Sequence, residues 1–317
     1  MSITTKPLSP HIGLEVSGID LSVEISESDK KAILDAWSKG GILLFRNCTS
    51  EEQLLRLSEC FGRLEASATK SLNTLSSPYL MNLQHDPEQP DAPGTQMMVN
   101  NEQRNGWLGW HWDQSFMPII VRGAALRMTE PATVAGETGF IDGIAAYDRL
   151  SDELKKRIDD LEVVYEFEGE MDKNRFGFPK DLKNLRSKAE LEAQKKVFDF
   201  PPVIHPMVIT QPETGRKVLK LSPMHARYIL GMDSEESDAL LAQVADHLVD
   251  PEYAYFHRWS KDEVLVWDNW RVIHSAQGVP PDVRRVAQRT TIMGDYGHGR
   301  YLDSSRDRTS ITDKIVD

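Results

Sequence analysis

The chain has 317 residues, of which 40% are hydrophobic and 27% are charged, a composition typical of soluble globular proteins. Its net charge of -12 at pH 7 argues against nucleic acid or an anionic membrane surface as the main partner, although a local pair of arginines could still bind an anionic small molecule. The N-terminus has no apolar core of signal-peptide length, and no run of apolar residues is long enough to predict a membrane span. Cys48 and Cys60 have no metal-site or redox-motif spacing, so we expect free thiols in a reducing compartment, the cytoplasm.

The first 65 residues predict mixed α/β structure. Residues 13–21 read as a short strand, and residues 28–39 carry apolar positions at helical spacing. Residues 42–47 (ILLFRN) predict a buried strand, and residues 51–61 a helix with two glutamates in its first turn.

The middle of the chain predicts a loop and then helices. Residues 84–109 are rich in Pro, Asp and Gln, so we expect a long loop that borders the active site. A strand is expected over 118–128. The charged stretches 151–163 and 180–196 predict a helical insertion over about 151–200.

Short strands dominate the last third, with one further helix expected over 235–249. The strands are expected at 203–210, 217–221, 264–269, 271–276 and 289–294. Many short strands between Gly and Pro turns favour a β-rich α+β fold, a sandwich or barrel with added helices.

Three side chains are candidate metal ligands. His111 and Asp113 in GWHWDQSF are two residues apart, so on a strand both would point to one face. Chance HxD pairs are common in a chain with nine histidines, so a plain strand or turn is the alternative. His274 in WDNWRVIHSAQG lies on a later predicted strand and could complete a 2-His-1-carboxylate site; otherwise it is a hydrogen-bonded core histidine.

Arg285 and Arg289 are the candidate anion-binding residues. Their spacing places both on one face of a strand, where buried guanidiniums need carboxylate partners. A bound dicarboxylate could supply one partner, while solvated surface arginines are the alternative.

Segments across nearly the whole chain, taken in order, resemble the taurine / 2,4-dichlorophenoxyacetate dioxygenase (TauD/TfdA) family. The segments are GLEVSGIDLS (13–22), LSECFGRLE (57–65), WHWDQSF (110–116), AGETGFIDGIAAYDRLSDELK (135–155), HPMVITQPETGRKVLKLSP (205–223), RWSKDEVLVWDNWRVIHSA (258–276) and RRVAQRTTIMGD (284–295). The resemblance implies one domain over 1–317 with a double-stranded β-helix (jelly-roll, cupin-like) core, flanking helices and the helical insertion.

The resemblance also implies roles for residues. His111, Asp113 and His274 match the iron ligands, and Thr138 and Arg285 match residues that bind the distal carboxylate of 2-oxoglutarate. Arg289 matches an arginine that faces either the substrate anion or the C1 end of 2-oxoglutarate. Asp268 and Asn269, in the segment before the second histidine, are expected to form a turn and to support the site rather than to act in catalysis.

The activity implied is that of an Fe(II)- and 2-oxoglutarate-dependent dioxygenase, which consumes O2 and releases succinate and CO2. It would hydroxylate or otherwise oxidise an unactivated C–H bond of a small organic molecule. Because Asp113 retains its carboxylate where a halogenase would need a small residue, we expect no halogenation.

The substrate is less well determined. Trp107, Met98 and Phe116 favour an apolar or ring-containing substrate, and His85 in the expected loop could contact it. Trp107 and Met98 could instead pack beneath the loop. If Arg289 is free, a small anionic substrate such as a sulfonate, sulfate ester or aryloxyalkanoate is the alternative, whereas the apolar reading suits secondary metabolism.

Two other classes of function fit the sequence less well. A metal-dependent hydrolase would not need an arginine eleven residues after the last histidine, and a non-catalytic binding barrel would not need all three ligands. We expect a small-molecule substrate and a homo-oligomer, a dimer or tetramer.

Overall fold

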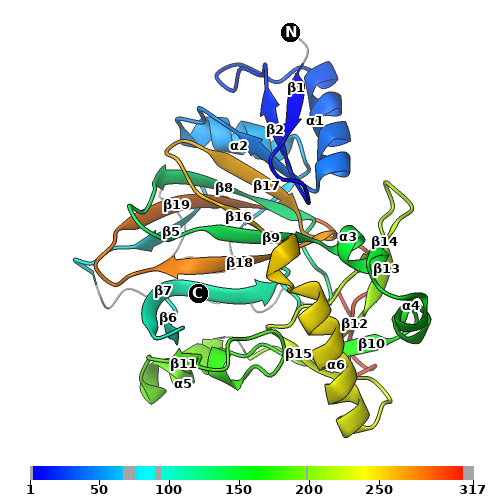
Figure 1. Cartoon of the computed structure of the whole chain (residues 1–317). Helices are drawn as coiled ribbons and strands as arrows, with labels where there is room; N and C mark the ends of the chain where they lie inside the picture. The colour runs from blue at the N-terminus through cyan, green and yellow to red at the C-terminus, as the bar shows by residue number, and fades with distance from the viewer. Residues whose placement is uncertain (1–2, 67–73, 75, 90–93, 198, 310–317) are drawn as a thin grey trace.

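The computed structural model describes residues 3–309 apart from 67–73, 75, 90–93 and 198. Two β-sheets pack face to face, and helices Glu27–Gly40 and Glu51–Glu59 cover the outer side of the larger sheet (Figure 1). Over the described residues, the larger sheet has the order β1-β2-β3-β17-β8-β19-β4, with β5 also paired to β19. Its strands are β1 (Thr4–Pro7), β2 (Leu14–Ser17), β3 (Ile42–Phe45), β4 (Leu64–Glu65), β5 (Met81–His85), β8 (Gly123–Glu130), β17 (Val264–Asp268) and β19 (Arg285–Ile292).

The facing sheet has the order β11-β6-β7-β18-β9-β16. Its strands are β6 (Gln96–Val99), β7 (Glu102–His111), β9 (Thr138–Asp142), β11 (Lys183–Asn184), β16 (Tyr255–His257) and β18 (Val272–Val279). A third sheet and a hairpin lie beside it, formed by β10 (Glu162–Tyr165), β12 (Val203–Pro206), β15 (Ala226–Ile229) and β20 (Arg300–Tyr301), and by β13 (Val208–Thr210) with β14 (Lys217–Leu219). The helices are α1 (Glu27–Gly40), α2 (Glu51–Glu59), α3 (Gly143–Asp148), α4 (Asp152–Ile158), α5 (Lys188–Val197) and α6 (Ser234–Leu248), with short 3-10 turns η2 (Met171–Lys173) and η3 (Pro251–Tyr253).

Side chains of the larger sheet alternate between two cores. Leu43 and Val266 point outward and pack with residues of α1 and α2. Their neighbours Leu44 and Leu265 point inward and join residues of the facing sheet. Apolar residues at successive positions therefore bury both faces, as expected for a strand covered on both sides.

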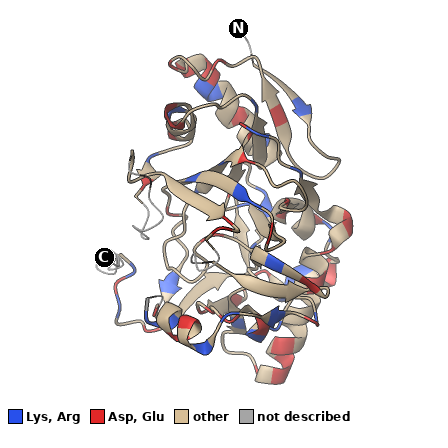
Figure 2. Cartoon of the chain, turned by 90° about the vertical axis from the view of Figure 1, so that its left-hand side faces the viewer, with Lys and Arg blue, Asp and Glu red and all other residues tan. Residues whose placement is uncertain are grey.

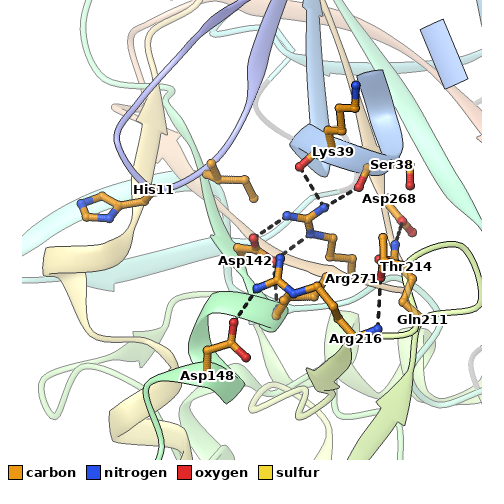
Figure 3. Close-up of polar contacts among 12 residues, drawn as sticks. His11, Ser38, Lys39, Asp142, Asp148, Gln211, Thr214, Arg216, Asp268 and Arg271 are labelled. Carbon is orange, nitrogen blue, oxygen red and sulfur yellow. Dashed lines mark hydrogen bonds and ion pairs between the residues drawn. The ribbon is translucent and has the colours of Figure 1, made fainter. Parts of the chain in front are cut away.

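Arg271 joins the start of β18 to two helices (Figure 3). Its Nε and Nη2 donate to the carboxylate of Asp142 at 2.9 and 2.6 Å, and Asp142 also caps the N-terminus of α3. Its Nη1 donates to the carbonyls of Ser38 and Lys39 in the last turn of α1, where carbonyls lack intrahelical partners. This buried guanidinium therefore has partners both at the start of α3 and at the end of α1.

The expected long loop at 84–109 is wrong for most of its length. Strands β6 and β7 form a hairpin there, in which Val99 pairs with Glu102. The two residues between them, Asn100 and Asn101, have φ of 51° and 62°. Asparagine tolerates positive φ, which a type I′ hairpin turn requires at both positions, so the Asn-Asn pair was an overlooked turn signal.

The expected helical insertion at 151–200 is wrong in part. It contains α4 and α5, but β10 joins the sheet with β12 and β15, and β11 pairs with β6. The strands expected later in the chain are confirmed to within a few residues, and α6 confirms the helix expected over 235–249.

No helix among the described residues is long and apolar enough to cross a membrane. Acidic and basic residues are interspersed along the ribbon in the view of Figure 2.

Candidate functional site

The three candidate metal ligands come together between the two main sheets. His111 ends β7, Asp113 lies in the turn that follows, and His274 lies on the neighbouring strand β18. Their ligand atoms all lie within 4.8 Å of one another, and all three side chains are buried. Trp112, between the first two, points the other way and is fully buried in a separate core.

Hydrogen bonds orient each of the first two ligands. Nδ1 of His111 lies 2.7 Å from the carbonyl oxygen of Gly109. A carbonyl only accepts, so Nδ1 carries the proton and Nε2 keeps its lone pair for a metal. Asn269 holds the backbone of Asp113 on both sides: its Oδ1 accepts from the Asp113 N–H at 2.7 Å and its Nδ2 donates to the Asp113 carbonyl at 3.1 Å. This confirms the expectation that Asn269 supports the site.

The protonation states of the three side chains suit metal binding. Burial lowers the pKa of His111 and, together with His111, lowers that of His274 well below its ordinary value, so both rings stay neutral. Burial acts to raise the pKa of Asp113, but Arg289, His274 and His111 outweigh it and hold that pKa below its ordinary range. Two neutral imidazoles beside an ionised carboxylate are what a divalent transition metal requires.

A layer of buried charges lies behind the ligands. Nζ of Lys220 donates to the carbonyl of Asn269 and lies 4.2 Å from the centre of the Trp112 ring. Asp268 accepts from Arg122 at 3.0 Å and from Gln211 at 2.7 Å. The buried lysine was not anticipated, because a lysine in a short strand segment such as KVLKLS is usually interpreted as an outward-facing residue.

Arg289 pairs with the metal-site carboxylate. Its Nη2 lies 2.8 Å from Oδ2 of Asp113, while Oδ1 of Asp113 lies 3.7 Å from Nε2 of His274. The two carboxylate oxygens thus face different partners. Arg289 is therefore engaged by the chain itself, which weakens the case for it as a free substrate anchor.

Arg285 shares a face of β19 with Arg289 but has no such partner. Burial lowers the pKa of Arg285 to about 10, and no hydrogen bond or ion pair to its guanidinium is found within the described part of the chain. Thr138 lies on the inward face of β9, in register with Ala276. Its Oγ1 accepts from Nε1 of Trp259 at 3.0 Å, which leaves the hydroxyl proton free to donate elsewhere. No sequence pattern pointed to Trp259 as a residue of the site.

Because Gly136 has no side chain, Arg285 can approach closely to the chain just before the strand that carries Thr138. A Cβ at Gly136 would lie 3.5 Å from Cδ of Arg285 and 3.2 Å from the side chain of Val279, and its φ is +81°. A cation without a partner, a free hydroxyl proton and close backbone approach suit one carboxylate end of a ligand.

The candidate substrate residues divide between the two faces of the smaller sheet. Trp107 pairs with Gln277, and Leu108 with Ala276, which shares its face with His274. A bulge in β7 between Leu108 and His111 sets this register, so Trp107 points away from the metal cluster. There it borders a surface pocket of about 360 Å³ with Arg104, Glu137 and Phe256. Trp107 is therefore not brought to the site; Leu108 lies on the site's face instead.

Two further candidates, His85 and Met98, lie on the inward side. His85 pairs with Arg285 and shares its face of the larger sheet, and Nδ2 of Asn105 lies 3.4 Å from Nε2 of His85. Met98 is on the same face of the β6–β7 hairpin as Asn105. Phe116, three residues after Asp113, packs in an aromatic cluster that includes His225.

Comparisons with known proteins agree with this geometry. The model of the family "Taurine catabolism dioxygenase TauD, TfdA family" matches residues 4–291. An (S)-phenoxypropionate/alpha-ketoglutarate-dioxygenase from Sphingobium herbicidovorans is 28% identical, over 91% of this chain and 94% of its own. A pentalenolactone F synthase from Streptomyces avermitilis is 27% identical, over 93% of this chain and 95% of its own.

A solved structure extends the likeness to three dimensions. The crystal structure of AAD-2 in complex with Mn(II) and N-oxalylglycine has a TM-score of 0.69 and 26% identity, and the match covers 93% of this chain and 98% of that one. Family model, relatives and fold agree over nearly the whole length, so this chain belongs to the TauD/TfdA family of dioxygenases.

Proposed function

We propose that the chain uses Fe(II), 2-oxoglutarate and O2 to hydroxylate or otherwise oxidise an unactivated C–H bond of a small organic molecule, releasing succinate and CO2. The observation that carries this is the cluster of His111, Asp113 and His274, together with an arginine without an anionic partner, Arg285, on the face of β19 that also carries Arg289. We also propose that the two facing sheets form a double-stranded β-helix core and that residues 1–317 are one domain.

The two histidines and the aspartate would hold the iron on one side and leave positions for other ligands. Arg285 and the hydroxyl of Thr138 would bind the distal carboxylate of 2-oxoglutarate, with Trp259 fixing the hydroxyl. When bound, iron and 2-oxoglutarate supply the activation of O2. Arg289 would hold Oδ2 of Asp113 and leave Oδ1 toward the metal.

The substrate we favour is apolar or ring-containing. Arg289 is paired with Asp113, and Phe116 offers an aromatic surface close to the ligands. The pentalenolactone F synthase relative fits a role in secondary metabolism. The alternative is a small anion such as an aryloxyalkanoate, a sulfonate or a sulfate ester, for which the phenoxypropionate dioxygenase is the precedent and His85 and Arg289 the candidate contacts. We further propose a cytoplasmic homo-oligomer.

The test measures succinate formed from 2-oxoglutarate by purified protein with Fe(II), O2 and a library of both substrate classes, with Asp113→Ala as the control. Succinate that depends on iron and O2 and rises with one class supports the proposal and selects the substrate. Failure of wild-type protein to bind either Fe(II) or 2-oxoglutarate contradicts it.

A further inference from the structure

Lys220 contacts both of the chain segments that carry the metal ligands. It directly follows β14 and is 1% exposed, so its side chain is enclosed by protein. Its Nζ donates to the carbonyl of Asn269 and lies 4.2 Å from the centre of the Trp112 ring. Trp112 lies between the first two metal ligands, and Asn269 lies shortly before the third. One amino group therefore joins the two segments from behind the site.

Asn269, the acceptor for Lys220, has a partner at each of its polar atoms. Its backbone N–H donates to the carbonyl of Arg122 at 2.9 Å, and its carbonyl accepts from Lys220. Its Nδ2 donates to the carbonyls of Asp113 and Val121 at 3.1 and 3.0 Å, and its Oδ1 accepts from the N–H of Asp113 at 2.7 Å. Lys220 thus holds the backbone of the residue whose side chain holds Asp113.

Lys220 has no counter-charge that would explain its burial. Among the described residues it is the only buried lysine, and no ion pair joins it to a carboxylate there. Asp268, next to Asn269, accepts instead from Arg122 and Gln211. Burial lowers the pKa of Lys220 well below its ordinary value. Replacing a buried polar group of this kind by an apolar side chain of similar volume is commonly neutral or stabilising, so packing alone does not account for a lysine here.

We propose that Lys220 is a positioning residue of the metal site, whose Nζ fixes the carbonyl of Asn269 and, through the Asn269 side chain, the backbone of Asp113. The proposal rests on the metal-dependent function above and adds a residue that acts on it without touching the metal or the substrate. Groups that orient metal ligands from outside the first layer affect metal affinity although they do not bind the ion. The chain of hydrogen bonds from Lys220 to Asp113 supplies such an orienting path.

The first test uses the metal-free protein and reads the position of Asp113 directly. In Lys220→Met, the amide of Asp113 should exchange hydrogen for deuterium about fivefold faster than in wild type, because its acceptor on Asn269 is less firmly held. NMR measures the exchange. The amides of α2, on the outer side of the larger sheet, should exchange at the wild-type rate. Equal acceleration at both places would indicate a general loss of stability and would contradict a positioning role.

The second test measures Mn(II) affinity by following the free ion with EPR. Lys220→Met should weaken binding about tenfold. The urea midpoint of the metal-free variant should equal or exceed that of wild type. Lys220→Gln keeps a donor on a slightly shorter side chain and should recover part of the affinity. Lys217→Met is the matched control, because Lys217 is an exposed lysine of the same segment that pairs with Asp159, and it should change neither quantity.

Three results would overturn the proposal. The first is Mn(II) binding that is unchanged or tighter in folded Lys220→Met, and the second is an Asp113 amide that exchanges no faster. The third is failure of both Lys220 variants to fold, which would make the role of Lys220 structural. If wild-type protein does not bind Mn(II), the metal-dependent function fails, whereas the exchange measurement still decides whether Lys220 positions Asp113, so the two failures are distinguishable.

Discussion

Two arginines, Arg271 and Arg285, differ in whether the protein supplies partners for their guanidinium groups. Arg271 is 5% exposed and donates four hydrogen bonds, two to Asp142 and two to the end of α1 (Figure 3). Arg285 is half-buried, and no partner for its guanidinium exists in the described part of the chain. The first arginine has its partners within the fold, whereas the second has none there, which is the basis of the anion-binding role proposed for it.

The energetic reason is the cost of taking a cation out of water. A buried guanidinium with a carboxylate and several acceptors recovers that cost locally, so its role is structural. One without partners destabilises the ligand-free protein and is stabilised when a carboxylate binds. Unsatisfied buried groups, more than charged groups in general, therefore mark the functional side of this molecule.

The largest effect is expected on removing Arg271. Arg271→Met should lower the free energy of unfolding by about 3–5 kcal/mol, because Asp142 is left buried without its cation. Urea unfolding measures this. Arg216→Met is the matched control, since Arg216 forms an exposed ion pair with Asp148 and should change stability by less than about 1 kcal/mol. Equal losses of unfolding free energy in the two variants would contradict a structural role specific to Arg271.

Removing Arg285 should affect ligand binding and leave the fold intact. Arg285→Met should raise the KM for 2-oxoglutarate by about 10- to 100-fold, as for the loss of hydrogen bonds to a charged group. Its stability without ligand should equal or exceed that of wild type, because an unpaired cation is removed. Thermal shift gives a second readout: 2-oxoglutarate should stabilise wild type and not the variant. A large loss of stability in Arg285→Met would contradict this interpretation.

A smaller effect is expected at Thr138. Thr138→Val removes one hydroxyl and should raise the KM for 2-oxoglutarate about fivefold, the value of one net hydrogen bond. It also leaves Nε1 of Trp259 without its acceptor, so a loss of about 1 kcal/mol in stability should accompany it. Thr138→Ser keeps the hydroxyl and should restore both quantities. A KM unchanged in Thr138→Val would exclude the hydroxyl from 2-oxoglutarate binding.

The smallest effect is a pH dependence at Arg285. Burial lowers its pKa in the folded protein to about 10, while the unfolded chain keeps the higher ordinary value. Above about pH 10 the unfolded state therefore holds a proton that the folded state has lost, and stability conferred by this group rises with pH. Below this pKa, Arg285 is charged in both states, and the full cost of burying the cation lowers the free energy of unfolding. The difference in unfolding free energy between Arg285→Met and wild type should thus shrink as pH rises from neutral to beyond that value, and a constant difference would argue against burial as the cause.

Local sequence patterns predicted much of the site. The alternation of strand side chains predicted that Arg285 and Arg289 share a face, and this is found. His111 and Asp113 do come together as expected, but Asp113 lies in the turn after β7 and not on the strand. The same reasoning could not find the β6–β7 hairpin within 84–109, because proline and aspartate outside the strands dominated the composition and the Asn100-Asn101 turn was overlooked.

The sequence by itself determined the residue types of the site, the order of its segments and the periodicity of its strands, since these depend on neighbours along the chain. Only the tertiary structure decided which groups meet. The pairing of His111 with His274 across 163 positions, the bulge that turns Trp107 away, and the contact of Arg289 with Asp113 all depend on strand register. Register is fixed by long-range packing, and a shift of one residue reverses every side chain, so local patterns could not specify it.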